Sequence, residues 1–319
     1  MIRASSVKQL PRFGIRRIAV ACGVFDGLHR GHAKIIDTLR ECARDTDAAT
    51  VVITFEPHPK SVLRPSEQPQ RLLSQRHKFH LLEQARIDAV VIIPFTPALA
   101  QLRPDEFIDR LLSGNDLEIT AFCVGESWRF GHKAQGDTTT LKGLGEQYNF
   151  AVVPVPPVLV DGQPVSSTRV REALRAGDMD RVRELLGRNF SIMESVKFGK
   201  GIATSDLNCP TANIACGNEA YPRSGVYAAR VRIHRSDKGM ESYGGVLYIG
   251  DSPTFVQSPS AAPNVEIHIF DFNREIYGEM VEVELIEFLR EDRKFASVEL
   301  LKEQIAEDVE TARKLVGQN

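Results

Sequence analysis

The stretch RRIAVACGVFDGLHRGHAKIIDTLRECAR, residues 16–44, decides the fold of the first half of the chain. Its apolar beginning, residues 16–22, predicts a buried strand, and residues 32–44 carry apolar side chains at helical spacing. Between strand and helix lie three glycines, an arginine and His29, and His32 opens the predicted helix. Open α/β sheets bind ligands at such strand-to-helix turns, so the sequence predicts a binding site here.

The composition of this turn suits a phosphate group. A helix start offers backbone N–H groups and a positive dipole end, and glycines let the backbone approach a ligand closely. Two histidines three residues apart can donate to the same phosphate. The alternatives are a surface turn with two unrelated histidines, or a zinc site, for which no further Cys/His pair stands at ligand spacing. No G-x-x-x-x-G-K-[ST] pattern occurs, which excludes a P-loop.

The segments that follow repeat the strand-and-helix alternation. Near-continuous apolar runs predict further buried strands, and amphipathic stretches between them predict helices. The strands are expected at 50–55, 88–95, 119–125 and 150–156, and the helices at 76–86 and 104–113. This alternation indicates an α/β domain with a parallel sheet of about five strands, covered on both faces.

The pattern changes in the second half. Two short helices are expected within 166–187, with Gly177 ending the first, Asp178 capping the second and Gly187 ending it. Four later segments alternate apolar and polar residues, as half-buried antiparallel strands of a small barrel do. They are 225–234, 244–250, 264–272 and 280–289, and a helix over 297–316 closes the chain. The sequence therefore predicts two domains, residues 1–187 and 188–319.

Composition narrows the class of protein. The net charge is -2 and the pI about 6.5, which is unlike a strongly basic nucleic-acid binder. The five cysteines form no CxxC pair, so we expect them reduced and the protein cytoplasmic. We recognise neither a signal peptide nor an apolar run of transmembrane length, so no membrane partner is expected.

The motifs together resemble one enzyme family. GVFDGLHRGH (23–32) resembles the HxGH signature of the nucleotidyltransferase superfamily. Six further segments follow in the order of the bacterial bifunctional riboflavin kinase/FAD synthetase family: TFEPHPKSVLRP (54–65), PFTPALAQLRPDEFI (94–108), VGESWRFGHKAQGD (124–137), SSTRVREALRAGD (166–178), PTANI (210–214) and VEIHIFDFNREIYG (265–278). The resemblance implies a Rossmann-like nucleotidyltransferase domain before a riboflavin kinase β-barrel with a C-terminal helix.

The implied chemistry has two steps. ATP phosphorylates riboflavin to FMN, and a second ATP adenylylates FMN to FAD with release of pyrophosphate. The resemblance implies Mg²⁺ as cofactor and riboflavin, FMN, FAD and ATP as partners; the oligomeric state is not predicted.

The resemblance assigns residues to the adenylylation step. His29, His32 and Arg171 would be catalytic, with the two histidines holding the ATP phosphates. Hydroxyls at a helix start followed by an arginine also form an anion site, although such hydroxyls are equally common as plain N-caps. The residues expected to bind nucleotide are Gly23, Phe25, Asp26, Gly31, Ser167, Thr168 and Gly201.

Two residues, Trp128 and Arg129, are expected to bind the flavin. They follow an apolar strand, on a loop near the predicted site. Trp128 either stacks on the flavin or fills the core, and the sequence leaves both open.

A second set of residues would serve phosphorylation. Thr211 and Asn213 offer oxygen donors of the kind that Mg²⁺ prefers. By resemblance Glu266 is the general base, whereas its alternation with apolar neighbours alone would favour a surface glutamate.

The chain departs from the family pattern around this second site. Asn208 and Cys209 replace Gly-Phe, and Tyr248 and Ser252 replace an asparagine and an arginine. These changes predict a weak kinase, partly compensated by Lys200. The alternative function is therefore FMN adenylyl transfer alone, with a flavin-binding but weak or inactive kinase module. A non-catalytic, flavin-responsive interaction protein is a third hypothesis, against which the intact His29, His32 and Arg171 argue.

Overall fold

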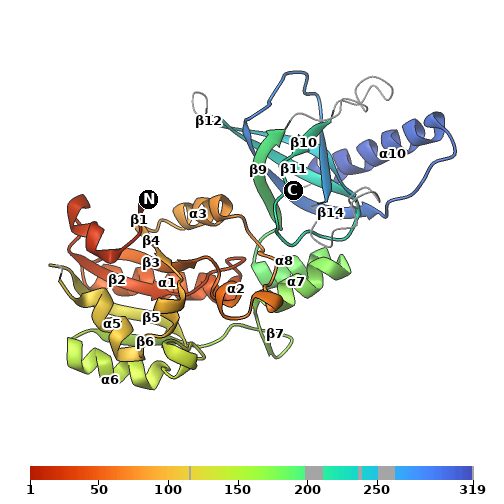
Figure 1. Ribbon diagram of the computed structural model, residues 1–319. Coiled ribbons are helices and arrows are strands. Elements are labelled where there is room, and N and C mark those ends of the chain that lie inside the picture. Colours follow the sequence, from red (N-terminus) through yellow and green to blue (C-terminus); the bar gives the residue numbers. More distant parts are fainter. Residues whose placement is uncertain (115, 198–210, 236–238, 251–262, 318–319) are drawn as a thin grey trace. The chain divides into compact units, whose positions relative to one another are not determined.

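The computed structural model describes residues 1–114, 116–197, 211–235, 239–250 and 263–317 (Figure 1). The chain forms two compact units. The first contains residues 1–69 and 78–166, and the second contains residues 70–77 and 167–319.

The first unit is built on a parallel sheet, as the sequence predicts. The strand order is β1-β4-β3-β2-β5-β6, with every neighbouring pair parallel. The strands are β1 (Ile2–Ala4), β2 (Arg17–Cys22), β3 (Ala49–Glu56), β4 (Ala89–Pro94), β5 (Glu118–Gly125) and β6 (Ala151–Val155). The sequence does not predict β1, because three residues are too few to show a period of two.

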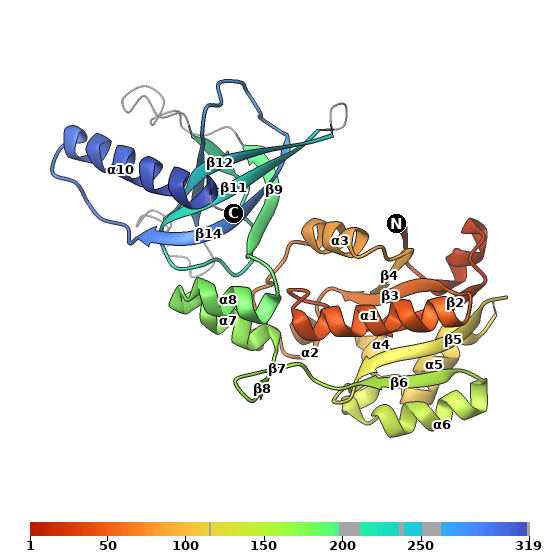
Figure 2. The same ribbon diagram turned by 180° about the vertical axis from the view of Figure 1, so that it is seen from behind.

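Helices cover both faces of this sheet (Figures 1 and 2). Ile18 and Val20 of β2 point to one face, where they join the core that α5 (Pro104–Leu112) and α6 (Thr138–Tyr148) complete. Because successive strand residues face opposite sides, Ala19 and Ala21 point to the other face, on which α1 (Arg30–Asp45) packs. The small alanines leave room for that helix close to the sheet.

Shorter elements surround the sheet. They are η1 (Val7–Phe13), α2 (Pro59–Leu63), η2 (Pro65–Glu67), α3 (Gln75–Gln84), α4 (Pro97–Ala100), η3 (His132–Ala134), β7 (Leu159–Val160) and β8 (Gln163–Pro164). The strand order reverses between β2 and β5, since β3 and β4 follow on one side and β6 on the other. Ligands bind at such a reversal, beyond the carboxyl ends of the strands.

The second unit is a closed antiparallel barrel with the order β10-β13-β12-β11-β14-β9. Its strands are β9 (Ser191–Lys197), β10 (Ala212–Ile214), β11 (Gly225–Arg235), β12 (Gly239–Gly250), β13 (Asn264–Ile269) and β14 (Met280–Arg290). The barrel is confirmed. The sequence does not predict β9 and β10, because β9 lacks strict alternation and β10 is only three residues long.

Helices accompany the barrel in the second unit. α7 (Ser167–Ala176) ends before Gly177, and α8 (Met179–Leu186) is capped by the Asp178 side chain and ends at Gly187 in the left-handed conformation, as the sequence predicts. The C-terminal helix α10 (Val298–Gly317) packs on β11, β12 and β14 (Figure 2), where Ala312 is fully buried.

Candidate active sites

The loop between β2 and α1 lies at the reversal of the strand order. Three of its residues have left-handed backbone: Phe25 at φ 53°, Gly27 at 84° and Leu28 at 42°. Two of the three carry side chains, for which this conformation is costly and typically kept at functional sites. These backbone conformations therefore indicate a loop whose conformation serves a function.

The two signature histidines meet at the start of α1. Their rings stack with centroids 3.7 Å apart and planes 16° from parallel. His29 is the N-cap, and its Nδ1 accepts a hydrogen bond of 3.4 Å from the backbone N–H of His32. When Nδ1 of a neutral imidazole accepts, Nε2 carries the proton and is a donor. His29 is buried and His32 half-buried, so both imidazole rings are held at the helix start.

The residues of this loop that are predicted to bind nucleotide pack closely around the two histidine rings. A Cβ at Gly31 would lie 3.2 Å from the His29 ring, and one at Gly23 would lie 3.3 Å from the Phe25 ring. The ring of Phe25 lies 5.2 Å from that of His32. Asp26 is buried in the same loop. The glycines therefore make room for the aromatic and imidazole rings.

A cavity of about 810 Å³ opens beside this loop, with Gly23 and Val24 in its lining. Its walls combine aromatic rings with basic groups. The aromatic residues are Phe55, Phe95, Phe107, Trp128 and Phe130, and the basic or titratable ones are His58, Lys60, Arg64, Arg129, His132 and Lys133. No aspartate or glutamate is among the described residues that line it. Such a cavity suits a planar aromatic ligand that carries negative charge.

The sequence left two roles open for Trp128, stacking on the flavin or packing in the core. Trp128 packs against the sheet core and stacks on Phe130, with ring centroids 4.6 Å apart and planes 12° from parallel. It also lines the cavity, beside Arg129. Arg129 is exposed, with Nη1 3.8 Å from Asp137 Oδ2. The indole therefore belongs to the wall of the cavity and to the edge of the core.

The loop around Trp128 is closely packed. The backbones of Phe130 and Gly136 exchange hydrogen bonds of 3.1 and 2.9 Å, and the N–H of His132 donates to the carbonyl of Leu102 at 2.7 Å. Gly131 has φ 73°, and a Cβ there would lie 2.8 Å from Pro104. Sequence reasoning missed the role of these two glycines. The sequence could have indicated them, because the two glycines flank the short segment that contains His132 and Lys133.

Three predicted residues, Ser167, Thr168 and Arg171, belong to the second unit. Ser167 and Thr168 open α7, as expected for hydroxyls at a helix start. Arg171 is buried, and its Nε donates to the carbonyl of Gln70 at 2.6 Å. Their association with His29 stays a prediction.

The residues predicted for phosphorylation come together in the barrel. Asn213 of β10 pairs in register with Glu266 of β13. Thr211 Oγ1 donates to Glu266 Oε2 at 3.2 Å, and Asn264 Nδ2 donates to Glu266 Oε1 at 2.8 Å. Glu266 is thus hydrogen-bonded through both carboxylate oxygens. Sequence reasoning missed Asn264, which its position two residues before Glu266 on one strand could have indicated.

The departures from the family pattern are described only in part. Tyr248 pairs in register with Glu266, and its hydroxyl donates to Asp292 Oδ2 at 2.9 Å. Gly201, Lys200, Asn208, Cys209 and Ser252 lie outside the described residues.

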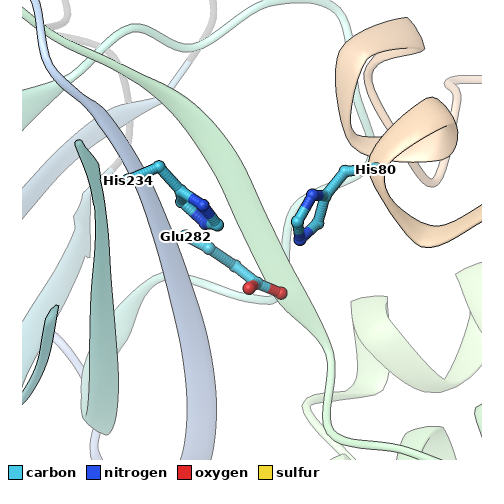
Figure 3. A group of neighbouring side chains, drawn as sticks. All are labelled: His80, His234 and Glu282. Carbon is cyan, nitrogen blue, oxygen red and sulfur yellow. The ribbon is translucent and has the colours of Figure 1, made fainter. Parts of the chain in front are cut away.

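A second polar cluster lies on the barrel, around Glu282 of β14. Figure 3 shows Glu282 with His234 of β11; His80, also drawn there, belongs to the first unit. Ser191 Oγ donates to Glu282 Oε1 at 2.9 Å, and His77 Nε2 lies 3.7 Å from the same oxygen. Burial by itself raises the pKa of Glu282, but the nearby His77, the hydrogen bond from Ser191 and the charge of Arg232 outweigh it and lower the pKa to about 2.

The pKa values of two neighbouring groups, His77 and Arg188, are also shifted. Burial is the main cause that lowers the pKa of His77, against the opposing effect of Glu282. Burial also lowers the pKa of Arg188 to about 10, although Glu282 opposes that shift. Nothing in the sequence pattern singles out this cluster, because its members come from separate elements.

Known proteins resemble the chain over nearly its whole length. The family model for FAD synthetase matches residues 14–169, and that for riboflavin kinase matches residues 186–316. A bifunctional riboflavin kinase/FMN adenylyltransferase from Haemophilus influenzae is 35% identical over 92% of this chain and 93% of its own. One of the same name from Pseudomonas fluorescens is 36% identical over 95% of this chain and 94% of its own.

A solved structure agrees with the fold. A protein of Streptococcus pneumoniae, described as a macrolide-efflux protein, matches with a TM-score of 0.80 and 27% identity, over 98% of each chain. Within the described residues of the present chain, none of the helices has the length and apolar character needed to cross a membrane.

Two stacked histidines at a helix start, an aromatic cavity with basic walls and a threonine–glutamate–asparagine group on a barrel thus accompany matches to both family models. Because the relatives are more than 30% identical to this chain over more than nine-tenths of its length, the chain belongs to the family of bifunctional riboflavin kinase/FMN adenylyltransferases.

Proposed function

We propose that the protein makes FAD from riboflavin in two steps, phosphorylation of riboflavin to FMN and adenylylation of FMN. The observation that carries the second step is the cavity with aromatic and basic walls beside the stacked His29 and His32. The match to the riboflavin kinase model over residues 186–316 supports the first step, and with it the bifunctional reading over adenylyl transfer alone. We assign the steps to domains 1–187 and 188–319.

In adenylyl transfer, a phosphate oxygen of FMN attacks the α-phosphorus of ATP and pyrophosphate leaves. Charge builds on the oxygens around the α-phosphorus, so the protein acts by positioning and by electrostatic stabilisation. His29 and His32 donate to these oxygens at the positive end of α1. Gly23, Phe25, Asp26 and Gly31 shape the nucleotide site, and Ser167, Thr168 and Arg171 add donors to phosphate.

The flavin occupies the cavity in this proposal. Its ring system lies against Trp128 and neighbouring aromatic side chains, and Arg129 with the other basic groups of the lining attracts the phosphate. Because the lining described carries no carboxylate, an anionic FMN is preferred there to neutral riboflavin.

In phosphorylation, the ribityl hydroxyl attacks the γ-phosphorus of ATP. Glu266 accepts the proton of that hydroxyl as general base. Thr211 and Asn213 fit Mg²⁺, because both offer neutral oxygen donors beside a carboxylate, and the proton of Thr211 is directed to Glu266, which leaves the oxygen lone pairs for the metal. When bound, Mg²⁺ neutralises charge on the phosphates of ATP. Gly201, outside the described residues, is assigned to nucleotide binding.

We place the protein in the cytoplasm, with small molecules and neither nucleic acid nor membrane as partners. Among the described cysteines, Cys22, Cys42, Cys123 and Cys216 are all free thiols, as in a reducing compartment.

One assay tests the function. The protein is incubated with riboflavin, ATP and Mg²⁺, and riboflavin, FMN and FAD are resolved by chromatography. We expect FMN to appear first and FAD after it, with pyrophosphate released in step with FAD. FMN without FAD, or no conversion of FMN supplied directly, would contradict the adenylyl transfer, and absence of both FMN and FAD from riboflavin would contradict the kinase.

A further inference from the structure

The helix α3 places a lysine inside the first unit. Lys78 is only 9% exposed, although lysine is a residue that folded proteins rarely bury. Its Nζ donates to the carbonyl of Val24 at 3.2 Å and to Thr54 Oγ1 at 3.4 Å. Burying an ammonium group costs free energy unless it is well paired, so a buried lysine at a loop suggests a specific task.

The carbonyl of Val24 stands where the chain leaves the sheet. The N–H of Gly23 donates to the carbonyl of Ile53 at 3.0 Å, which extends the pairing of β2 with β3 by one residue. The Val24 carbonyl then accepts from Lys78 and also from Thr54 Oγ1 at 3.1 Å. Two donors, one of them cationic, therefore hold the last peptide unit before the left-handed Phe25.

This peptide unit has two ends. Because a trans peptide is planar, its N–H, on Phe25, points opposite to the carbonyl that Lys78 and Thr54 hold. The positive charge at the carbonyl polarises the unit, which strengthens its N–H as a donor. Val24 also lines the cavity, so the fixed peptide borders the place proposed for FMN.

We infer that Lys78 is a positioning residue for adenylyl transfer: it fixes the Val24–Phe25 peptide and through it the loop that carries His29 and His32. This inference rests on the proposed adenylylation at that loop. Displacing catalytic groups by about 1 Å lowers the rate about 10²-fold, so we expect loss of Lys78 to slow the chemical step rather than to weaken substrate binding.

The test compares full-length wild type with Lys78→Met, Lys78→Arg and Thr54→Val. Each preparation is assayed for FAD formation from FMN and for FMN formation from riboflavin. For Lys78→Met we expect kcat of FAD formation to fall about 10²-fold, with KM for FMN within about twofold. Lys78→Arg, which keeps charge and donors, should recover part of the loss, and Thr54→Val should cost about tenfold or less. Riboflavin phosphorylation should stay at the wild-type rate throughout.

Lys142→Met is the matched control, since Lys142 is exposed on α6 of the same unit and should leave both rates unchanged. Wild-type kcat for FAD formation in Lys78→Met would overturn the inference, as would equal loss of both activities or no recovery in Lys78→Arg. If Lys78→Met does not fold, Thr54→Val decides: a selective fall in adenylyl transfer supports the inference and an unchanged kcat overturns it. Failure of the proposed function is separate, since the wild type itself would then form no FAD from FMN.

Discussion

At the scale of single residues, the ring of His29 has two uses. Its Nδ1 caps α1, and the other ring nitrogen is the donor that we assign to phosphate. The residue therefore joins a local folding signal to the proposed chemistry, and substitutions can separate the two.

His29→Asn keeps a side chain that caps helices well and removes the imidazole, so we expect the fold to persist. FAD formation from FMN should fall by about 10² to 10³, the usual cost of removing one donor to a developing charge. Riboflavin phosphorylation should not change, because Glu266 belongs to the other unit. Lys34→Met, at an exposed position of α1, is the control for the helix. Equal loss of both activities in a folded His29→Asn protein would contradict separate sites.

Glu282 and His77 predict how stability depends on pH. The folded pKa of Glu282, about 2, lies below the ordinary value of 4.5, so the stability that its carboxylate contributes is present above about pH 4.5 and is lost as the pH falls toward 2. The pKa of His77 is also lowered, from 6.5, so folding with a neutral ring loses stability as the pH falls below that value. Both effects have the same sign.

The midpoint of thermal unfolding should therefore decrease from pH 7 to 5 and further below pH 4.5. Glu282→Gln should be less stable than wild type at pH 6, and the difference should shrink as the pH approaches 2. Melting curves of both proteins across this range test the assignment. A difference that stays constant with pH would show that the carboxylate charge of Glu282 is not responsible.

At the scale of elements, the segment 128–136 forms one wall of the cavity by close packing rather than by regular structure. Gly131 and Gly136 allow it to lie against Pro104 and Phe130. The positive φ of Gly131 and the 2.8 Å approach of its missing Cβ to Pro104 leave no place for a side chain.

Gly131→Ala should lower the free energy of unfolding by about 1–3 kcal/mol, since it adds strain at a left-handed position. It should also raise KM for FMN, because Trp128 and Arg129 are carried by the same segment. Gly143→Ala is a matched control: Gly143 lies within α6, a Cβ there meets nothing within 4 Å, and alanine should stabilise the helix by about 0.5–1 kcal/mol. Denaturant unfolding measures the change in the free energy of unfolding, and rates of FAD formation at increasing FMN concentration measure the change in KM. An unchanged KM in Gly131→Ala would separate the segment from flavin binding.

At the scale of the whole molecule, the two proposed reactions use different residues: His29 and His32 belong to the first unit, and Glu266 belongs to the second. FMN is the product of one step and the substrate of the other. Because different residues are proposed to act in each step, we expect a chain that has lost one activity to keep the other.

Mixing two inactive variants tests this independence. Glu266→Gln should lose about 10² to 10⁴ in FMN formation through loss of the base, with Glu303→Gln, exposed on α10, as control. Neither Glu266→Gln nor His29→Asn should convert riboflavin to FAD at an appreciable rate. Their equimolar mixture should do so, because FMN made by one chain reaches the other. If the mixture stays inactive while each variant keeps its own activity, FMN passes only within a chain.

The sequence by itself determined the two-part architecture, because apolar runs with helices between them and strict alternation are local signals of different sheets. It also singled out His29 and His32 as candidate site residues, and Glu266 through the family resemblance; their roles stay predictions. The caps at Asp178 and Gly187 were predictable for the same reason, since each depends on its own few residues.

Only the tertiary structure decided which distant residues meet. The cavity combines segments around Phe55, Phe107 and Trp128, and the Glu266 group joins residues 55 positions apart. Lys78 is inconspicuous in its sequence, where it reads as one polar position of an amphipathic helix. Its burial against Val24 depends on how α3 packs, and packing is set by all the segments together rather than by any one of them.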